Sequence, residues 1–191
     1  MNLLYYFVVK LPKRLNDEIK MGDQEIFLET KFNEFEHRIH EGEVVHTPLK
    51  FDTPVKPGDI LYFHHLVVIN GGMPFADYKD HYVVSFDPDV AINSHAYAYT
   101  PQGTTDILPL DGWSILEPTF EEGVEDSMFE VVEFEKKPRT TGVVSSPSQD
   151  LERLGVEVGD TVGFKRNMDY TFQAFGKDFF RTRTEDLLYV L

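Results

Sequence analysis

Two nine-residue stretches decide the fold: Val55-Lys56-Pro57-Gly58-Asp59-Ile60-Leu61-Tyr62-Phe63 and Val156-Glu157-Val158-Gly159-Asp160-Thr161-Val162-Gly163-Phe164. Both follow the pattern Val-x-x-Gly-Asp-x-aliphatic-x-Phe. A Gly-Asp pair favours a tight turn, in which glycine takes a positive φ and aspartate bonds back to the backbone. The alternating residues that follow predict a strand with one face on a core. The chain is therefore expected to use one strand-launching turn twice.

Further matches around these stretches indicate a tandem repeat. Aligning Gly42–Pro48 with Thr141–Pro147 places Pro48 on Pro147 at an offset of 99, whereas Gly58 falls on Gly159 at 101. The remaining matches are Leu4–Lys10 with Trp113–Glu117, Tyr82 with Phe179, and Asp89–Ile92 with Asp186–Tyr189. Two motifs in the same order and at similar spacing predict two copies of one domain.

The rest of the sequence also favours strands. Its apolar runs are short, β-branched or aromatic, and bounded by Gly, Pro, Asp or Asn, which is typical of an all-β sandwich or barrel. The one expected helical turn is Ser148–Leu154, where Ser148 would cap the first turn and Leu151 and Leu154 would face inward. An apolar start without basic residues predicts a strand at Leu3–Val9 rather than a signal peptide.

Composition excludes several classes of function. The chain has 191 residues, no cysteine, and a formal net charge of −15 from 33 acidic and 18 basic residues. Without cysteine there are no disulfides, thiolate-bound metals or thiol catalysis. The acidic balance, with no basic cluster to offset it, argues against binding nucleic acid or anionic lipid. No apolar run approaches the roughly 20 residues of a membrane helix. These features are compatible with a cytoplasmic protein.

The order of the motifs resembles the GroES family of co-chaperonins. Each half has an apolar first strand, a long polar segment, a Val-Val strand ending at proline, the Gly-Asp turn and an Asp-aliphatic-aliphatic strand; Thr184–Val190 resembles the family's last strand. The resemblance implies two tandem GroES-like, partly open β-barrels, at residues 1–95 and 112–191, with 96–111 as a linker or extra strand. It also implies a homo-oligomeric ring that caps a GroEL-type chaperonin and assists ATP-dependent folding, with no catalysis and no cofactor of its own.

In that family a mobile loop docks on the chaperonin through an apolar tripeptide. The matching segment is residues 14–36, and Ile26, Phe27 and Leu28 resemble the tripeptide. The second copy offers a poorer match in Met128, Phe129, Val131 and Val132, within an acidic stretch. The alternative for residues 25–32 is an ordinary core strand.

Two departures from the family pattern point to a divergent member. The Gly-Gly that usually precedes the tripeptide is replaced by Gln24-Glu25, and both copies lack the hairpin that roofs the bacterial ring. A missing roof resembles bacteriophage co-chaperonins, which would act in the host cytoplasm, and the tandem arrangement resembles chloroplast ones.

Two other functions compete with the co-chaperonin hypothesis. One is a structural or assembly protein, for example of a virion, built on the same domains. The other is a metal-binding β-barrel, because all seven histidines lie between positions 37 and 95 and strands could bring His46, His64 and His81 together for zinc or iron. Solvated or core histidines are the plainer explanation.

Overall fold

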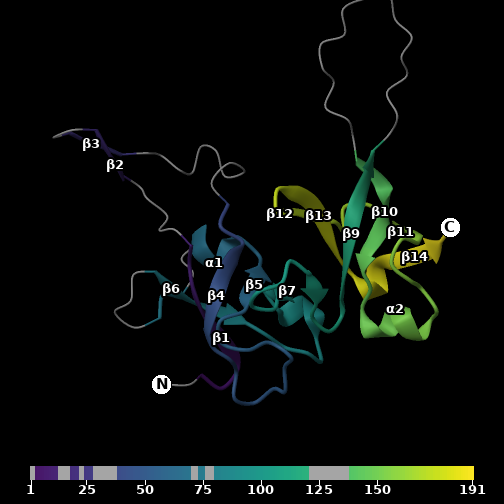
Figure 1. The fold of residues 1–191 in the computed structure, drawn as a ribbon, viewed down its shortest axis with the longest axis horizontal. Coiled ribbons are helices and arrows are strands. Elements are labelled where there is room, and N and C mark those ends of the chain that lie inside the picture. The colour runs from purple at the N-terminus through teal and green to yellow at the C-terminus, as the bar shows by residue number, and fades with distance from the viewer. Residues whose placement is uncertain are drawn as a thin grey trace, which may run out of the picture. The chain divides into compact units, whose positions relative to one another are not determined.

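The structure is a computed structural model that describes residues 3–12, 18–21, 24–27, 38–69, 73–75, 80–120 and 138–191. The chain divides into two compact units, Met1–Asp106 and Ile107–Leu191. The described residues form two six-stranded sheets and a separate two-stranded sheet (Figure 1). The all-β prediction is confirmed. The ladders of each six-stranded sheet run from one edge strand to another without closing.

The first large sheet has the strand order β6-β1-β4-β5-β7-β8. Its strands are β1 (Tyr6–Lys10), β4 (Glu41–His46), β5 (Ile60–Phe63), β6 (His81–Ser85), β7 (Ala96–Thr100) and β8 (Leu108–Pro109). The two-stranded sheet consists of β2 (Glu18–Met21) and β3 (Gln24–Phe27). A short helix, α1 (Leu66–Ile69), follows β5, and a 3-10 turn, η2 (Ala91–Asn93), precedes β7. The most deeply buried side chains of this unit come from β1, β4, β5, β6 and β7.

The second large sheet has the strand order β12-β13-β9-β10-β11-β14. Its strands are β9 (Trp113–Phe120), β10 (Pro138–Ser146), β11 (Thr161–Phe164), β12 (Tyr170–Ala174), β13 (Lys177–Arg183) and β14 (Leu187–Val190). The helix α2 (Gln149–Arg153) and the 3-10 turn η3 (Thr184–Asp186) complete the unit. Its core cluster is drawn from β9, β10, β11, β13 and the region of α2. None of the described helices is long and apolar enough to cross a membrane.

The two large sheets share one arrangement of strands. The order β6-β1-β4-β5-β7 in the first corresponds to β13-β9-β10-β11-β14 in the second. β1 pairs with β4 in the first sheet, and β9 pairs with β10 in the second. The register of these two ladders shifts at the same place. The strand orders therefore make β7 the counterpart of β14, and β1 the counterpart of β9.

The Gly-Asp turns form as the sequence predicts. Gly58 has φ +94° and Gly159 has φ +97°, both in the left-handed region that favours glycine. Asp59 accepts a hydrogen bond from the Lys56 backbone at 2.7 Å, and Asp160 accepts the matching bond at 2.9 Å. β5 begins directly after the first of these turns, and β11 directly after the second.

The register predicted around the first valine strand is wrong by one residue. Gly42 and Gly142 occupy the same ladder position, because each pairs with the second residue of the following strand. The offset is therefore 100, and the buried Pro48 corresponds to the buried Ser148 rather than to Pro147. Because each copy has two adjacent valines, the sequence alone fits either register. Burial selects one register, since a one-residue slip exchanges the two faces of a strand.

The counterpart predicted for the last strand is also wrong. β14 corresponds to β7, because Tyr99 pairs with Leu61 just as Val190 pairs with Val162. The expected match, Asp89–Ile92, lies instead in the connection before β7. The connection before β7 spans residues 86–95, whereas the connection before β14 spans only residues 184–186. This insertion before β7 shifted the sequence alignment of the two copies away from the true counterpart of β14. The segment 96–111, expected to be a linker or an extra strand, therefore begins with a principal strand of the first sheet.

The expected helical turn is present, with one side chain misplaced. The Ser148 hydroxyl accepts a hydrogen bond from the Leu151 backbone at 3.3 Å, which caps α2. Leu151 is buried as expected, but Leu154 is 78% exposed. The helix ends at Arg153, so Leu154 already belongs to the turn that leaves it.

Candidate functional site

Ile26 and Phe27, two of the residues expected to bind a chaperonin, lie in the strand β3 of a two-stranded hairpin. Among the described residues β2 and β3 pair with each other and with no other strand, with Ile19 opposite Ile26 and Glu18 opposite Phe27. Residues 24–27 form a strand, and in the strand order of the described residues β3 joins neither six-stranded sheet. Leu28 lies outside the described residues.

This hairpin belongs to a long connection that recurs in the second copy. Residues 11–40 join β1 to β4, and residues 121–137 join β9 to β10, which are the corresponding strands. Met128, Phe129, Val131 and Val132 all fall in the second connection and lie outside the described residues. Both predicted loops thus interrupt the domain at the same point of its topology.

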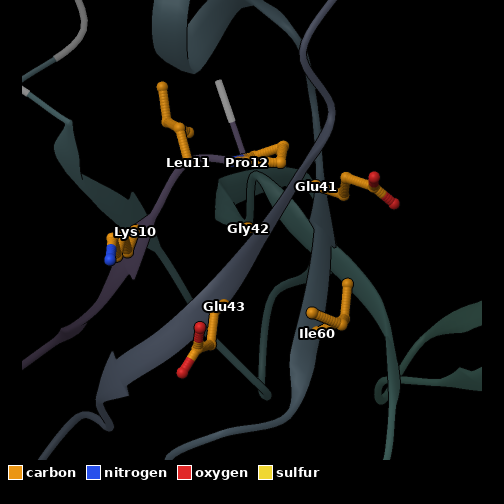
Figure 2. A pocket seen from close by; sticks show the side chains of 7 residues that line it. All are labelled: Lys10, Leu11, Pro12, Glu41, Gly42, Glu43 and Ile60. Atoms are coloured by element: carbon orange, nitrogen blue, oxygen red, sulfur yellow. The ribbon is translucent and has the colours of Figure 1, made fainter. Parts of the chain in front are cut away.

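A groove of about 270 Å³ lies where the first connection leaves and rejoins the sheet. It is lined by Lys10, Leu11, Pro12, Glu41, Gly42, Glu43 and Ile60 (Figure 2). Gly42 fits this position because a Cβ would lie 3.0 Å from the Lys10 carbonyl oxygen. Its polar side chains are those of Lys10, Glu41 and Glu43. We interpret it as the base of the connection, because its lining comes from the residues on both sides of that segment.

The three histidines considered for a metal site have separate surroundings. The His46 ring packs against Phe75 with 6.2 Å between centroids, whereas the His64 ring stacks on that of His65 at 4.6 Å. His81 lies 2.8 Å from the Asp80 carboxylate through Nδ1. Among the described residues, no three His, Cys, Asp or Glu side chains are placed to hold a metal ion.

In the first unit the surroundings shift the pKa values of one aspartate and two tyrosines. The hydrogen bond with His81 lowers the pKa of Asp80. Burial raises the pKa of Tyr62, whose hydroxyl lies 3.3 Å from the Thr100 hydroxyl, and burial also raises that of Tyr99. These shifts report packing and local pairing.

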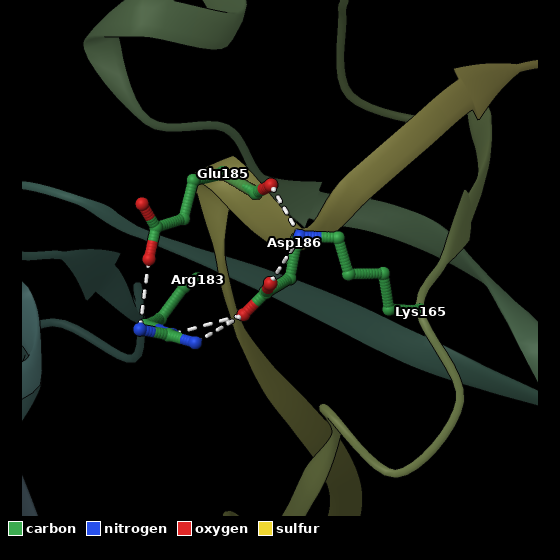
Figure 3. A network of polar contacts seen from close by, with 4 residues as sticks. All are labelled: Lys165, Arg183, Glu185 and Asp186. Atoms are coloured by element: carbon green, nitrogen blue, oxygen red, sulfur yellow. Dashed lines mark hydrogen bonds and ion pairs between the residues drawn. The ribbon is translucent and has the colours of Figure 1, made fainter.

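A buried carboxylate anchors the start of β14 (Figure 3). Asp186 is 3% exposed and receives Lys165 Nζ on one oxygen at 2.9 Å and Arg183 Nε and Nη2 on the other at 2.9 Å each. Arg183 also contacts Glu185 at 2.8 Å. A carboxylate at such depth is stable only when paired on both oxygens. The network therefore holds the end of β11 and the approach to β14 together.

The corresponding positions of the first unit carry a different polar set. The His64 backbone N–H donates to the His95 backbone carbonyl at 3.0 Å. In the same way the Lys165 backbone N–H donates to the Asp186 backbone carbonyl. His95 thus stands where the second unit has Asp186, and its Nδ1 lies 2.7 Å from the Ser85 hydroxyl. Imidazole and hydroxyl groups therefore occupy this place in the first unit.

Sequence reasoning missed both Asp186 as an anchor and the exposure of β14. The Asp-aliphatic-aliphatic pattern was visible, but nothing in the sequence distinguishes a buried aspartate from a turn residue. Neither a protein-family model nor a curated protein matches the chain.

Proposed function

We propose that the chain is a GroES-type co-chaperonin, built on two tandem domains of that kind, which caps a GroEL-type chaperonin. The observation that carries the proposal is the β2–β3 hairpin, which includes Ile26 and Phe27 and stands apart from the sheets. An apolar segment within a long connection suits capture by an apolar groove on a partner. ATP hydrolysis would belong to the partner.

The repeated topology supports this proposal. Each copy has a long connection between its first two central strands, so one chain would bring two candidate contacts to a ring-shaped partner. Burying one large apolar side chain contributes roughly 1.5–3 kcal/mol before the cost of ordering its segment. One such contact is weak, but several in a ring act together through effective concentration.

The test is a double substitution in the hairpin. Ile26→Asp with Phe27→Asp is expected to abolish ATP-dependent association with a GroEL-type chaperonin, measured by native mass spectrometry. The matched control is Val90→Asp with Ile92→Asp, which adds the same charge at residues that are 43% and 72% exposed in the first unit. The control should bind as the unmodified chain does. Equal binding by the hairpin variant and the control would refute the assignment.

A second candidate function is that of an assembly protein, for example in a virion. The exposed apolar strand β14 favours it, because such a surface is suited to contacts between subunits. A chain that assembles with itself but ignores chaperonin and ATP would support this function over capping.

A further inference from the structure

The β2–β3 hairpin has two faces of different chemistry. Residues that lie opposite each other in an antiparallel ladder belong to the same face, and the faces alternate along each strand. One face, here called the uncharged face, consists of Ile19, Met21, Gln24 and Ile26. The other face, here called the charged face, consists of Glu18, Lys20, Glu25 and Phe27. A partner that docks on the hairpin therefore meets a different surface on each side.

This division separates apolar residues that are neighbours in the sequence. Ile26 belongs to the uncharged face and Phe27 to the charged face, because successive residues of a strand alternate. Ile19 comes from the other strand and is the direct ladder partner of Ile26. Residues in such a position have Cβ atoms about 4.5–5.5 Å apart, which is close enough for both to enter one groove of a partner.

The charges determine which face suits an apolar groove. Burying an unpaired charge costs far more free energy than burying an apolar side chain gains. Docking the charged face would take Glu18, Lys20 and Glu25 out of water. Lys20 and Glu25 have each other across the ladder, but Glu18 has Phe27 opposite it, so its charge would have no counterpart there. Docking the uncharged face leaves all three charges in water.

We propose that Ile19 is a chaperonin-binding residue, and that Ile19 and Ile26 enter one apolar groove of the chaperonin as a cross-strand pair. The inference rests on the proposed function, because it names the face of the hairpin that the chaperonin contacts. It assigns recognition to residues of both strands rather than to three consecutive residues. Pairing of β2 with β3 is then required for binding, since it brings Ile19 beside Ile26.

The cross-strand pair also defines the groove that would fit it. Neighbouring strands lie about 4.7–4.9 Å apart, so the groove must hold two aliphatic side chains abreast. Isoleucine is β-branched and favours strands, so a substitution at Ile19 acts on the contact, on the hairpin, or on both. The variants that test the inference must separate these two effects.

Three substitutions of Ile19 in the whole chain make this separation. Ile19→Asp should weaken ATP-dependent association with a GroEL-type chaperonin by about 100-fold or more, because the groove would have to accept a charge. Ile19→Thr keeps the β-branched shape and should weaken association by about tenfold through the lost apolar contact. Ile19→Val keeps both properties and should bind within about threefold of the unmodified chain.

The matched control lies on the charged face. Lys20→Gln lowers the charge of the hairpin by one unit, as Ile19→Asp does, and should bind within about threefold of the unmodified chain. Biolayer interferometry with immobilised chaperonin measures each affinity. A loss in Lys20→Gln as large as that in Ile19→Asp would overturn the inference, because the contact would not be confined to the uncharged face. Normal binding by Ile19→Thr would overturn it as well.

Ile26→Asp provides the reference that distinguishes this inference from the proposed function. If Ile26→Asp binds as the unmodified chain does, the proposed function fails and the inference fails with it. If Ile26→Asp loses binding and Ile19→Asp does not, the proposed function stands and the inference is overturned. Loss of binding in both variants, with the control unaffected, is the expected result.

Cysteine protection compares the two faces without removing a charge and an apolar contact together. The chain has no cysteine, so Ile19→Cys and Lys20→Cys each carry a single thiol. Chaperonin with ATP should slow alkylation of the thiol at position 19 by iodoacetamide about tenfold or more and leave the thiol at position 20 reactive, as mass spectrometry of the chain would show. Equal protection at both positions, protection at position 20 alone, or a complex that protects neither thiol would refute the assignment.

Discussion

Replacing Asp186 with asparagine tests whether the ion network positions β14. The substitution keeps the shape of the side chain and removes its charge. Both carboxylate oxygens accept hydrogen bonds from cations, one from Lys165 and the other from Arg183. An amide has only one acceptor oxygen, so its NH₂ group must face one of these cationic donors.

The magnitude follows from the burial of the three partners. Removing one member of a fully buried ion pair costs roughly 3–5 kcal/mol, because the other charge is left buried and unpaired. Here the Asp186 side chain is 4% exposed, but those of Lys165 and Arg183 are 49% and 23% exposed, so water compensates both cations in part. We therefore expect the free energy of unfolding of the second unit to fall by about 2 kcal/mol.

Denaturant unfolding followed by tryptophan fluorescence measures this change for the second unit alone. Trp113 is 4% exposed and pairs in register with Arg183. The matched control is Asp150→Asn, which removes the same charge from an ion pair with Arg153 whose side chains are 64% and 73% exposed. The control should change stability by less than about 0.5 kcal/mol. Equal shifts in the two variants would refute the anchoring role of Asp186.

Two further predictions concern the core of each unit. Gly142→Ala should destabilise the second unit by about 1–3 kcal/mol, because the added Cβ would lie 2.9 Å from the Leu116 Cβ; unchanged unfolding by tryptophan fluorescence would contradict this. In the first unit, burial raises the pKa of Tyr62 above its ordinary value of 10.0, so its stabilising contribution is present below that pH and lost as the pH rises through the folded pKa. Tyr62→Phe should therefore weaken the alkaline loss of stability measured by circular dichroism, and an unaltered pH profile would argue against this origin.

The turns and the strand content could be predicted because their causes are local. Gly58 and Gly159 need a positive φ, and the aspartates that follow them bond to a backbone only three residues away. The cap of α2 by Ser148 is equally local. Such features depend on a few consecutive residues and not on how the strands are arranged in the sheets.

For the candidate binding segment, the sequence supplied a hypothesis and could not say whether the segment joins a sheet. The apolar residues Ile26 and Phe27 were recognised from the sequence, but whether their segment joined the core depended on strand pairing. In the described part of the chain β3 pairs with β2 and with no strand of the large sheets. Strand pairing also decides where the histidines lie, because His46 and His81 are on strands that flank β1 on its two sides.

The sequence by itself determined that this protein is all-β, that two Gly-Asp turns launch corresponding strands, and that thiol chemistry is excluded. Only the tertiary structure decided the register of the repeat and the identity of its last strand. Adjacent valines satisfy two registers equally until one of them is buried, and the ten-residue connection before β7 hides its equivalence to β14. Which edge remains open is likewise a property of the assembled sheet, because an apolar strand has the same sequence whether or not another strand covers it.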